Sequence, residues 1–448
     1  MQIRTSIPDL HCKSGIEALS DEIFCVYLHK TTSMKARYIF KNIEKAKGGK
    51  YGRILVLTGA RQTGKTTLAK EGFPGYVYLS IEDPVMRRQY VSLTASQWKS
   101  LYPEAILDEI QKEPQLIESI KAVYDQWQEP RYILTGSSQL LLMDKVRESL
   151  AGRCLIFEIY PLTVPEIETG SWTDDVKSSA FQDMLLTSQV LELFPSFMLD
   201  PRYAAKMAAW NHYACFGGYP ALTDEDMTDD ERYLWLAAYV RTYLERDVRD
   251  LASFRDLEPY VKLQKLLALQ TGGLFNSAAL ATHAGVSAKT VRRYLQYLEM
   301  SYQTITLQAW EKNVSRRFVK SPKIHYLDYG VLQAVVGKHG TPTGEEFESM
   351  VIAELYKQAR QTGINTKFYH LRMSSGSEVD CLIEIEKGYY AFEIKQAEHV
   401  QDSDARHLKN LSAILDKPLL HGFVLSNDVQ TRTIAPDITA VHVAQMLG

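Results

Sequence analysis

The sequence Gly59-Ala60-Arg61-Gln62-Thr63-Gly64-Lys65-Thr66 decides the fold of the first part of the chain. It follows a β-rich run at residues 53–58 and precedes Thr67-Leu68-Ala69-Lys70, which is typical of a helix. In this strand–loop–helix context, glycines let backbone N–H groups face phosphate oxygens at the positive end of the helix. Such a P-loop places its lysine on the β- and γ-phosphates and its last hydroxyl on Mg²⁺. We therefore expect ATP and Mg²⁺ as cofactors, with the nucleotide held by Gly59, Ala60, Arg61, Gln62, Thr63, Gly64, Lys65, Thr66 and Thr67, and with Thr66 also binding the metal.

Two adjacent acids supply the partner that a P-loop needs. Asp108 and Glu109 end the β-rich run that begins at Ala105, about 40 residues beyond the P-loop. We expect Asp108 to hold the Mg²⁺ shell and Glu109 to polarise the attacking water. Because the two acids are adjacent, the pattern favours hydrolysis of the nucleotide over passive binding.

Five β-rich runs alternate with helix-like segments between residues 53 and 160 and begin at Arg53, Tyr76, Ala105, Arg131 and Cys154. This alternation predicts an α/β fold with a five-stranded parallel sheet covered on both faces. In this architecture the run from Arg131 lies between the P-loop strand and the acidic strand, so that its end meets the γ-phosphate. Ser137 is the expected γ-phosphate sensor, and Thr135 is the alternative.

Arg153 closes the helix that precedes the fifth run, at the rim of the expected sheet. From there an arginine can reach the nucleotide of a neighbouring subunit as an arginine finger, which would make the protein a homo-oligomer. A structural ion pair is the alternative interpretation of Arg153.

Composition excludes several classes of protein. The chain has 448 residues, 45% of them apolar, and 51 Lys and Arg against 54 Asp and Glu, a net charge of −3. These values exclude a disordered chain and a protein that is basic throughout, and the length suggests about three domains. Five widely spaced cysteines without a Cys-x-x-Cys pair fit reduced thiols. No apolar run reaches the roughly 18–20 residues that span a bilayer, and no signal peptide is visible, so we expect a cytoplasmic protein without membrane contact.

The sequence divides into five expected segments. The first fits no domain pattern, and we hypothesise that translation begins at Met34 and that the preceding residues are a poorly ordered extension. Beyond the β-rich runs, Leu, Ala, Tyr and Trp recur at helical spacing until strands return near Ile324. The segments are an N-terminal extension (1–33), an ATPase core (34–160), a helical lid (161–257), a helix-turn-helix with a β-rich tail (258–323) and a second α/β domain (324–448).

The helix-turn-helix is expected from its caps and turn. Ser277 and Ser287 can cap two successive helices, and Gly285 permits the turn between them. The β-like run from Tyr302 would form a wing. Together these features predict a winged helix-turn-helix.

The second of these helices has a basic face. Residues 285–323 contain eight Lys or Arg against two Glu, a local charge of +6 that the whole-chain balance hides. Apolar Val291, Leu295 and Leu298 share the opposite face. A free face of this kind suits contacts with DNA phosphates and grooves, so DNA is an expected partner. The expected DNA-binding residues are Lys289, Arg292, Arg293 and Gln296, and a solvated basic face on a packing module is the alternative.

The last domain carries an acidic cluster. Its expected order is helix 345–361, strands 367–372, 378–385 and 389–395, helix 402–415 and strand 422–426. Asp380 lies on one strand, and Glu393 and Lys395 share a face of the next, so a hairpin could bring the three together. Either Glu348 or Glu354 on the first helix could add a fourth group. Two carboxylates can bind a divalent metal while a lysine stabilises charge at a scissile phosphate, although a buried ion-pair network is the alternative.

Several motifs, taken in order, resemble one family. They are the P-loop at 59–67, Leu-Asp-Glu-Ile-Gln at 107–111, Thr-Gly-Ser-Ser at 135–138, Leu-Ala-Gly-Arg at 150–153, Tyr-Pro-Leu-Thr-x-x-Glu at 160–166 and Phe-Gly-Gly-Tyr-Pro at 216–220. Over residues 34–448 the series resembles prokaryotic AAA+-type ATPases with a C-terminal domain of unknown function. The resemblance implies an ATPase core, a lid, a winged helix and a terminal fold similar to PD-(D/E)XK nucleases. It places the helix acid at Glu348, so that Glu348, Asp380 and Glu393 would bind the metal and Asp380, Glu393 and Lys395 would carry catalysis.

Two functions follow from these expectations. In the first, ATP hydrolysis repositions a DNA-binding module and a metal-dependent nuclease-like domain. In the second, the protein is an ATP-driven protein-interaction or remodelling switch whose terminal domain is inactive. RNA is a lesser alternative to DNA as the substrate.

Overall fold

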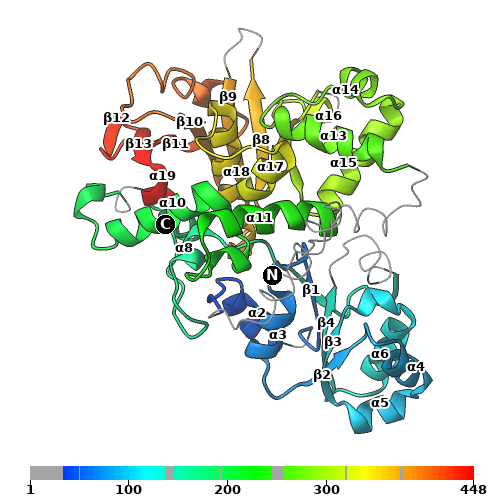
Figure 1. The fold of residues 1–448 in the computed structure, drawn as a ribbon. Coiled ribbons are helices and arrows are strands. Elements are labelled where there is room, and N and C mark those ends of the chain that lie inside the picture. Colours follow the sequence, from blue (N-terminus) through cyan, green and yellow to red (C-terminus); the bar gives the residue numbers. More distant parts are fainter. Residues whose placement is uncertain are drawn as a thin grey trace, which may run out of the picture.

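The computed structural model describes residues 34–49, 51–136, 146, 148–190, 194–244, 256–317, 320–373 and 378–448. The extension at 1–33 and the expected sensor Ser137 lie outside these residues. Elements are identified by the labels of Figure 1, in which the first sheet occupies the lower part of the molecule and the second sheet the upper part.

The first sheet has five parallel strands in the order β2-β3-β4-β1-β5, as expected for an α/β fold of the P-loop kind. The strand from Arg131 lies between the P-loop strand and the acidic strand, which confirms the predicted order. The strands are β1 (Ile54–Thr58), β2 (Val77–Ser80), β3 (Glu104–Asp108), β4 (Arg131–Gly136) and β5 (Leu155–Glu158).

Helices cover both faces of this sheet. Ile54 and Val56 pack against one group of helices and Leu55 and Leu57 against the other, because alternate side chains of a strand point to opposite faces. The first face is covered by α4 (Pro84–Ser92), α5 (Ala95–Leu101) and α6 (Gln115–Gln126), and the second by α2 (Phe40–Lys47) and α3 (Lys65–Gly72).

The middle of the chain is helical, as predicted. The helices of this segment include α8 (Val164–Ile167), α9 (Ala180–Thr187), α10 (Tyr203–Phe216), α11 (Asp229–Tyr239), a π-helix (Val240–Leu244), α13 (Glu258–Leu269), α14 (Ser277–Ala284) and α15 (Ala288–Met300), with short 3-10 helices at Phe197–Leu199 and Pro220–Thr223. A further 3-10 helix, Ile110–Lys112, follows β3 near the first sheet. In Figure 1, α8, α10 and α11 lie between the two sheets, and α13, α14 and α15 lie beside the second sheet.

The helix-turn-helix forms with one change to its caps. Ser287 caps α15 by accepting from the N–H of Thr290, and Gly285 makes the turn at φ 70°. The prediction that Ser277 caps α14 is wrong, because the side chain of Asn276 accepts hydrogen bonds from the first N–H groups of the helix instead. An Asn side chain reaches these donors as readily as a Ser side chain does, so the cap falls one residue earlier.

The second sheet has eight strands in the order β12-β13-β11-β10-β9-β8-β6-β7. The strand that was expected to form a wing, β6, is part of this sheet. It pairs antiparallel with β7 and parallel with β8. The strands are β6 (Thr304–Ala309), β7 (Lys323–Tyr326), β8 (Lys367–Arg372), β9 (Glu378–Ile385), β10 (Gly388–Ile394), β11 (Leu419–Ser426), β12 (Arg432–Ala435) and β13 (Ile438–His442), and the helices are α16 (Val314–Arg317), α17 (Tyr329–Val336), α18 (Gly344–Thr362) and α19 (Val443–Leu447).

The prediction of a helix at 402–415 is wrong. Residues 402–410 form successive turns, and a 3-10 helix spans only Leu411–Ala413. Asn410 has φ 66°, a left-handed conformation that a continuous α-helix does not accommodate. The strands β12 and β13, which follow β11, had no counterpart in the sequence prediction.

One continuous core joins the lid, the helix-turn-helix and the last domain. Buried residues such as Phe181, Leu263, Leu298, Val351 and Phe392 belong to the same apolar cluster. The predicted boundary at residue 323 falls at the first residue of β7, within the second sheet. These three segments therefore fold around shared apolar contacts, whereas the first sheet has separate cores on its two faces.

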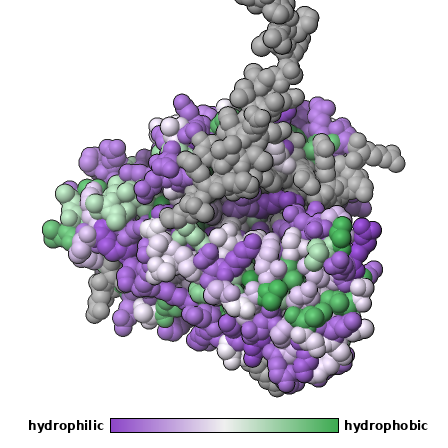
Figure 2. All heavy atoms as spheres, turned by 60° about the horizontal axis from the view of Figure 1, so that its bottom comes forward, coloured by the Kyte–Doolittle hydropathy of each residue, from purple (hydrophilic) through white to green (hydrophobic). Residues whose placement is uncertain are grey.

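The surface seen in Figure 2 is mainly hydrophilic, with apolar side chains in small separate groups. Within the described residues, no helix combines the length and apolar character that crossing a bilayer requires. Cys154, Cys215 and Cys381 are free thiols.

Candidate nucleotide, metal and nucleic-acid sites

The P-loop wraps tightly around the end of β1. At Gly59 an added Cβ would lie 2.1 Å from the carbonyl oxygen of Ile159, so only glycine fits there. Gly64 caps α3 in a left-handed conformation with φ 86°, which glycine adopts without strain. Lys65 is buried, and its ammonium donates to the carbonyl oxygens of Gly59 (3.1 Å) and Ala60 (2.7 Å).

Asp108 lies at the centre of a hydroxyl cluster at the carboxyl ends of the strands. Its Oδ1 accepts from the Thr66 hydroxyl at 2.9 Å and from the Thr135 hydroxyl, and its Oδ2 accepts from the Tyr78 hydroxyl at 2.7 Å. The structure thus brings together Thr66, Asp108 and the alternative sensor Thr135. An oxygen-rich group of this kind suits Mg²⁺, because that ion binds through a carboxylate and hydroxyl oxygens beside nucleotide phosphates.

Tyr78 was missed by the sequence analysis. It lies on β2, whose pairing with β3 places Ser80 opposite Asp108. Burial raises the pKa of Tyr78, and its hydrogen bond to Asp108 raises it further, so the phenol remains a donor. The signal lay in the second β-rich run, Tyr76-Val77-Tyr78, but only the sheet order shows which strand neighbours the acidic one.

Glu109 has an unusual backbone. Its φ of 59° is left-handed, which costs about 1–2 kcal/mol for a residue with a Cβ. Its N–H donates to the Thr135 hydroxyl oxygen at 3.4 Å, and the Gln111 amide donates to its carboxylate. These contacts hold the carboxylate next to Asp108 at the edge of the sheet where a P-loop nucleotide binds.

Arg37 joins the P-loop to the lid. Its guanidinium donates to the carbonyl oxygens of Thr63 (2.9 Å) and Tyr160 (2.5 Å) and pairs with the buried Glu166 at 3.4 Å. Glu166, the acid of the Tyr-Pro-Leu-Thr-x-x-Glu motif, therefore holds Arg37 in contact with the P-loop. Arg37 was not among the residues expected at the site, although it lies in the amphipathic segment Met34-Lys35-Ala36-Arg37 that leads into the first strand.

A small cavity of about 90 Å³ lies beside Gly64 and Thr67. Leu162 and Pro220 supply its apolar wall, and Lys35 lies at its edge with its pKa lowered by burial. The lid also contacts the loop through the Tyr239 hydroxyl, which donates to the carbonyl of Arg61 at 3.2 Å. Lid and P-loop thus enclose one space next to the phosphate-binding turn.

Arg153 forms an ion pair with Asp125 on α6. Its Nε and Nη2 donate to the two carboxylate oxygens at 2.8 and 3.1 Å. This hydrogen bond lowers the pKa of Asp125. Arg153 therefore forms a structural ion pair, which was the alternative to its role as an arginine finger. Both side chains of the pair are partly exposed.

The basic face of α15 is exposed as predicted. Lys289, Arg292, Arg293 and Gln296 face solvent, whereas Val291, Leu295 and Leu298 are buried. The wider +6 stretch is only partly available, because two of its cations are buried in ion pairs. Arg317 pairs with Asp416 at 3.2 Å, and Lys323 pairs with Glu348 at 2.9 Å.

Asp380, Glu393 and Lys395 come together on the hairpin of β9 and β10, in which Cys381 pairs with Phe392. Lys395 Nζ lies 2.9 Å from Glu393 Oε1 and 3.9 Å from Asp380 Oδ2. Asp380 also accepts from the N–H of Ile394 at 2.8 Å. The predicted placement of these three side chains on one hairpin is thus observed.

Lys323 was missed as a member of this cluster. It pairs with Glu348 and, at 2.5 Å, with Glu378. Glu354, the alternative helix acid, lies elsewhere: it pairs with Lys357 inside the molecule and accepts from the N–H of Val164. Lys323 lies on β7, 25 residues before Glu348, and the packing of α18 against β7 brings the two side chains together.

The acids of the cluster repel one another. Burial and the neighbouring Asp380 raise the pKa of Glu393 to about 8 and that of Glu348 to about 7. Glu393 Oε2 is buried and has no hydrogen-bond partner among the described residues. A divalent cation at Asp380 and Glu393 would fit this oxygen and relieve the repulsion. Across the described ranges, however, no three carboxylate, imidazole or thiol side chains are grouped as ligands of one metal ion.

Comparison with protein families assigns three parts of the chain. Residues 51–168 match a family described as an AAA domain, and the match includes the P-loop, Asp108 and Thr135. Residues 207–341 and 343–446 match two families, each described as a domain of unknown function (DUF8612 and DUF4143). The chain thus carries an AAA-type P-loop ATPase domain, which supports ATP binding.

Relatives from different organisms align with most of this chain. An uncharacterized protein of Mycobacterium tuberculosis is 26% identical over 88% of this chain and 81% of its own length. Another, of Haemophilus influenzae, is 22% identical over 80% of this chain and 86% of its own. Among solved structures, a Walker-type ATPase of Pyrococcus abyssi covers 68% of this chain and 99% of its own (15% identity, TM-score 0.38), and the Aeropyrum pernix ORC1 protein in complex with DNA covers 70% and 95% (16% identity, TM-score 0.29).

Proposed function

We propose that this protein hydrolyses ATP with Mg²⁺ and uses the cycle to reposition DNA bound at α15 relative to the acidic cluster of β9 and β10. The observation that carries the first half is the 2.9 Å contact between Thr66 and Asp108 beside a buried P-loop lysine. A hydroxyl and a carboxylate in this arrangement share a Mg²⁺ ion in P-loop enzymes.

Each residue has a defined task in hydrolysis. Lys65 and the N–H groups at the start of α3 neutralise the phosphate charge, and Thr66 with Asp108 holds the cation. Mg²⁺ supplies charge neutralisation at the phosphate oxygens. Glu109, oriented by Gln111 and Thr135, accepts a hydrogen bond from the attacking water and so directs it.

Tyr302 supports coupling between the ATP site and α15. It follows Ser301, the C-cap of α15, and its hydroxyl contacts Thr58 Oγ1 at 3.4 Å and Glu158 Oε1 at 3.2 Å. Thr58 immediately precedes Gly59 of the P-loop. A change at the phosphates therefore has a short physical route to the DNA-facing helix.

ATPase assays with and without DNA test this proposal. We expect turnover that double-stranded or single-stranded DNA increases. Absence of turnover in both conditions, across a range of protein concentrations, would refute the proposal.

Substitution of the basic face should weaken DNA binding. Lys289→Ala and Arg293→Ala each remove one exposed cation, so each should lower affinity and reduce the slope of log K against log salt by about 1. Lys45→Ala, on an exposed lysine of α2, is the matched control. Fluorescence anisotropy at several salt concentrations measures this, and unchanged slopes in both α15 variants would exclude α15 as the DNA contact.

The acidic cluster should cleave DNA in the presence of Mg²⁺ or Mn²⁺. Asp380→Asn and Lys395→Ala should each lower cleavage about 100-fold or more, and EDTA should abolish it. Glu386→Gln, on an exposed acid beyond β9, should leave cleavage unchanged. A gel assay with purified variants measures the products, and equal cleavage by Asp380→Asn and wild type would point to a contaminating nuclease.

One observation favours a second function. Lys323 and Lys395 already pair with Glu348, Glu378 and Glu393, and such pairs can persist as an ion-pair network without catalysis. In that case the protein is an ATP-driven switch acting on other proteins, and the last domain is a scaffold. Metal-dependent cleavage lost in Asp380→Asn distinguishes the first function from this one.

Arg153 remains the proposed arginine finger of a homo-oligomer. Arg153→Ala should retain ATP binding and lower turnover about 1,000-fold. Asp125→Asn, which breaks the same ion pair but keeps the arginine, should leave turnover near wild type. Equal losses in both variants would assign Arg153 to the ion pair alone.

A further inference from the structure

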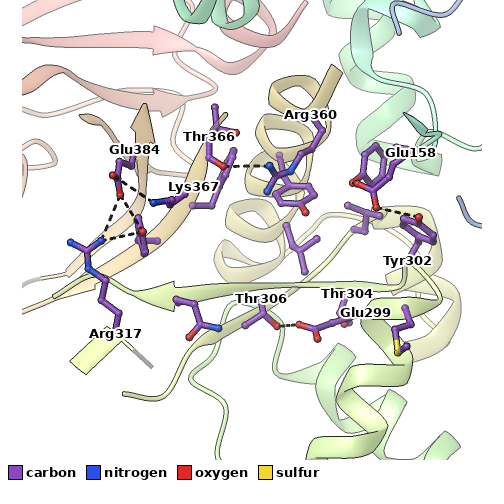
Figure 3. A pocket seen from close by; sticks show the side chains of 18 of the residues that line it. Glu158, Glu299, Tyr302, Thr304, Thr306, Arg317, Arg360, Thr366, Lys367 and Glu384 are labelled. Atoms are coloured by element: carbon purple, nitrogen blue, oxygen red, sulfur yellow. Dashed lines mark hydrogen bonds and ion pairs between the residues drawn. The ribbon is translucent and has the colours of Figure 1, made fainter. Parts of the chain in front are cut away.

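A cavity of about 730 Å³ lies where the ATPase core meets the second sheet (Figure 3). Its walls come from the segment after β5, the end of α15, β6, α18 and β8. Of the expected catalytic, nucleotide-binding, metal and DNA-contacting residues that the structure describes, none lines it. Its volume falls in the range of about 300–1,000 Å³ that is usual for small-molecule sites.

Aromatic rings form one part of the wall. Tyr160 makes edge contacts with Tyr302 (5.8 Å between ring centres) and Tyr356 (6.1 Å), and Tyr356 contacts Phe368 (5.3 Å). These contacts fix the rings in place. A fixed aromatic wall favours a flat ring as the ligand, because such a ring gains contact area without ordering the wall.

One side of the cavity offers the carboxylate of Glu299. The Glu299 carboxylate accepts from the Thr306 hydroxyl, and burial raises its pKa. A second lining carboxylate, Glu158, lies on the Arg360 side of the cavity and accepts from the hydroxyls of Tyr160 (2.7 Å) and Tyr302 (3.2 Å). Because a carboxylate only accepts, the Glu299 side suits a ligand edge that carries N–H donors.

The other side offers cations, with the carboxylates of Glu158 and Glu384 beside them. The Arg360 guanidinium lies over the Tyr356 ring at 4.7 Å and donates to the carbonyl of Thr366 at 3.3 Å. Lys367 is 59% exposed, and its Nζ lies 4.0 Å from Glu384. In Figure 3, Arg360 and Lys367 lie across the cavity from Thr304, Thr306 and Glu299. Guanidinium and ammonium groups placed in this way can bind a phosphate.

We propose that this cavity binds a nucleotide other than the ATP of the P-loop, with an amino-bearing base directed at Glu299 and a phosphate at Arg360 and Lys367. The donor edge, the flat ring and the anion are all present in a nucleotide. A carboxylate accepts from the amino groups of guanine, cytosine or adenine, whereas uracil lacks such a group. The ligand is either a free mononucleotide or a nucleotide at the end of a single strand.

Calorimetry on the full-length protein tests the proposal with guanosine and uridine 5′-monophosphates as probes. Guanosine monophosphate should bind about tenfold more tightly than uridine monophosphate. Glu299→Gln and Lys367→Ala should each weaken its binding about tenfold, because each removes one charge-assisted hydrogen bond. Glu386→Gln and Lys409→Ala, at exposed positions outside the cavity, are the matched controls.

Lys65→Ala separates this site from the P-loop. Guanosine monophosphate binding that persists in Lys65→Ala and falls in Glu299→Gln supports the cavity. Binding lost in Lys65→Ala and unchanged in Glu299→Gln and Lys367→Ala overturns it. A single-stranded oligonucleotide forms the second arm: if it binds in a Glu299-dependent way and free mononucleotide does not, the ligand is strand-borne. Absence of Glu299 dependence in both arms also overturns the proposal.

The measurement requires no ATP turnover or DNA cleavage. The binding test therefore distinguishes its outcomes even if the protein proves to have no ATPase activity. Circular dichroism of each variant confirms that the fold is retained.

Discussion

Lys65→Ala should lower ATP turnover at least about 100-fold without unfolding the protein. The ammonium is buried within the P-loop, 2.7 Å from the carbonyl oxygen of Ala60, next to the N–H groups that open α3. Removing one preorganised group of this kind typically costs a factor of about 10²–10³ in turnover. Phosphate release at saturating ATP measures the effect.

The exposed Lys45 on α2 provides the control. Lys45→Ala changes the net charge by the same amount and should leave turnover within about twofold of wild type. Because Lys65 donates to two loop carbonyls, a thermal melt of both variants should accompany the assay. Wild-type turnover in a folded Lys65→Ala protein would remove the P-loop from the reaction.

Lys357→Met should destabilise the protein by about 3–5 kcal/mol, because it leaves Glu354 charged and buried without its partner. Both side chains of this pair on α18 are fully buried, with Nζ 2.9 Å from Glu354 Oε2. Lys357 also donates to the carbonyl of Leu162 at 3.1 Å and lies over the Tyr213 ring at 4.4 Å. Urea unfolding followed by circular dichroism measures the free energy of unfolding.

The double variant Glu354→Leu/Lys357→Met should recover part of the lost stability, since it leaves no unpaired charge. An exposed pair offers the comparison: Lys99 lies 3.8 Å from Glu129, and Lys99→Met should cost less than about 1 kcal/mol. If Lys357→Met costs no more than Lys99→Met, the buried pair does not hold α18 in place.

The sequence predicted best where the signal is local. The P-loop, the acidic strand and the strand order around them depend on short motifs and on the parallel topology those motifs require. The two faces of α15 follow from helical periodicity, and the hairpin of Asp380 and Glu393 follows from strand alternation. In each case the deciding residues lie within a few positions of one another.

Prediction failed where contacts join distant segments. Lys323 reaches Glu348, 25 residues later in the sequence, because α18 packs against β7, and no local pattern encodes that packing. The strand expected as a wing has buried residues, including Thr304 and Leu307, because another part of the chain covers it. Tyr302 looked like the start of a strand, yet it contacts Thr58 more than 200 residues earlier.

The shared core has a practical consequence for dissecting the protein. Two family matches meet at residues 341 and 343, but α17 and α18 on either side of that point bury their residues in one apolar cluster. A cut there would expose the Leu332 and Val351 side chains to water, so neither fragment would be a natural unit for expression. The lid, helix-turn-helix and last domain should instead lose their structure in a single cooperative melt, and proteases should release them as one resistant piece.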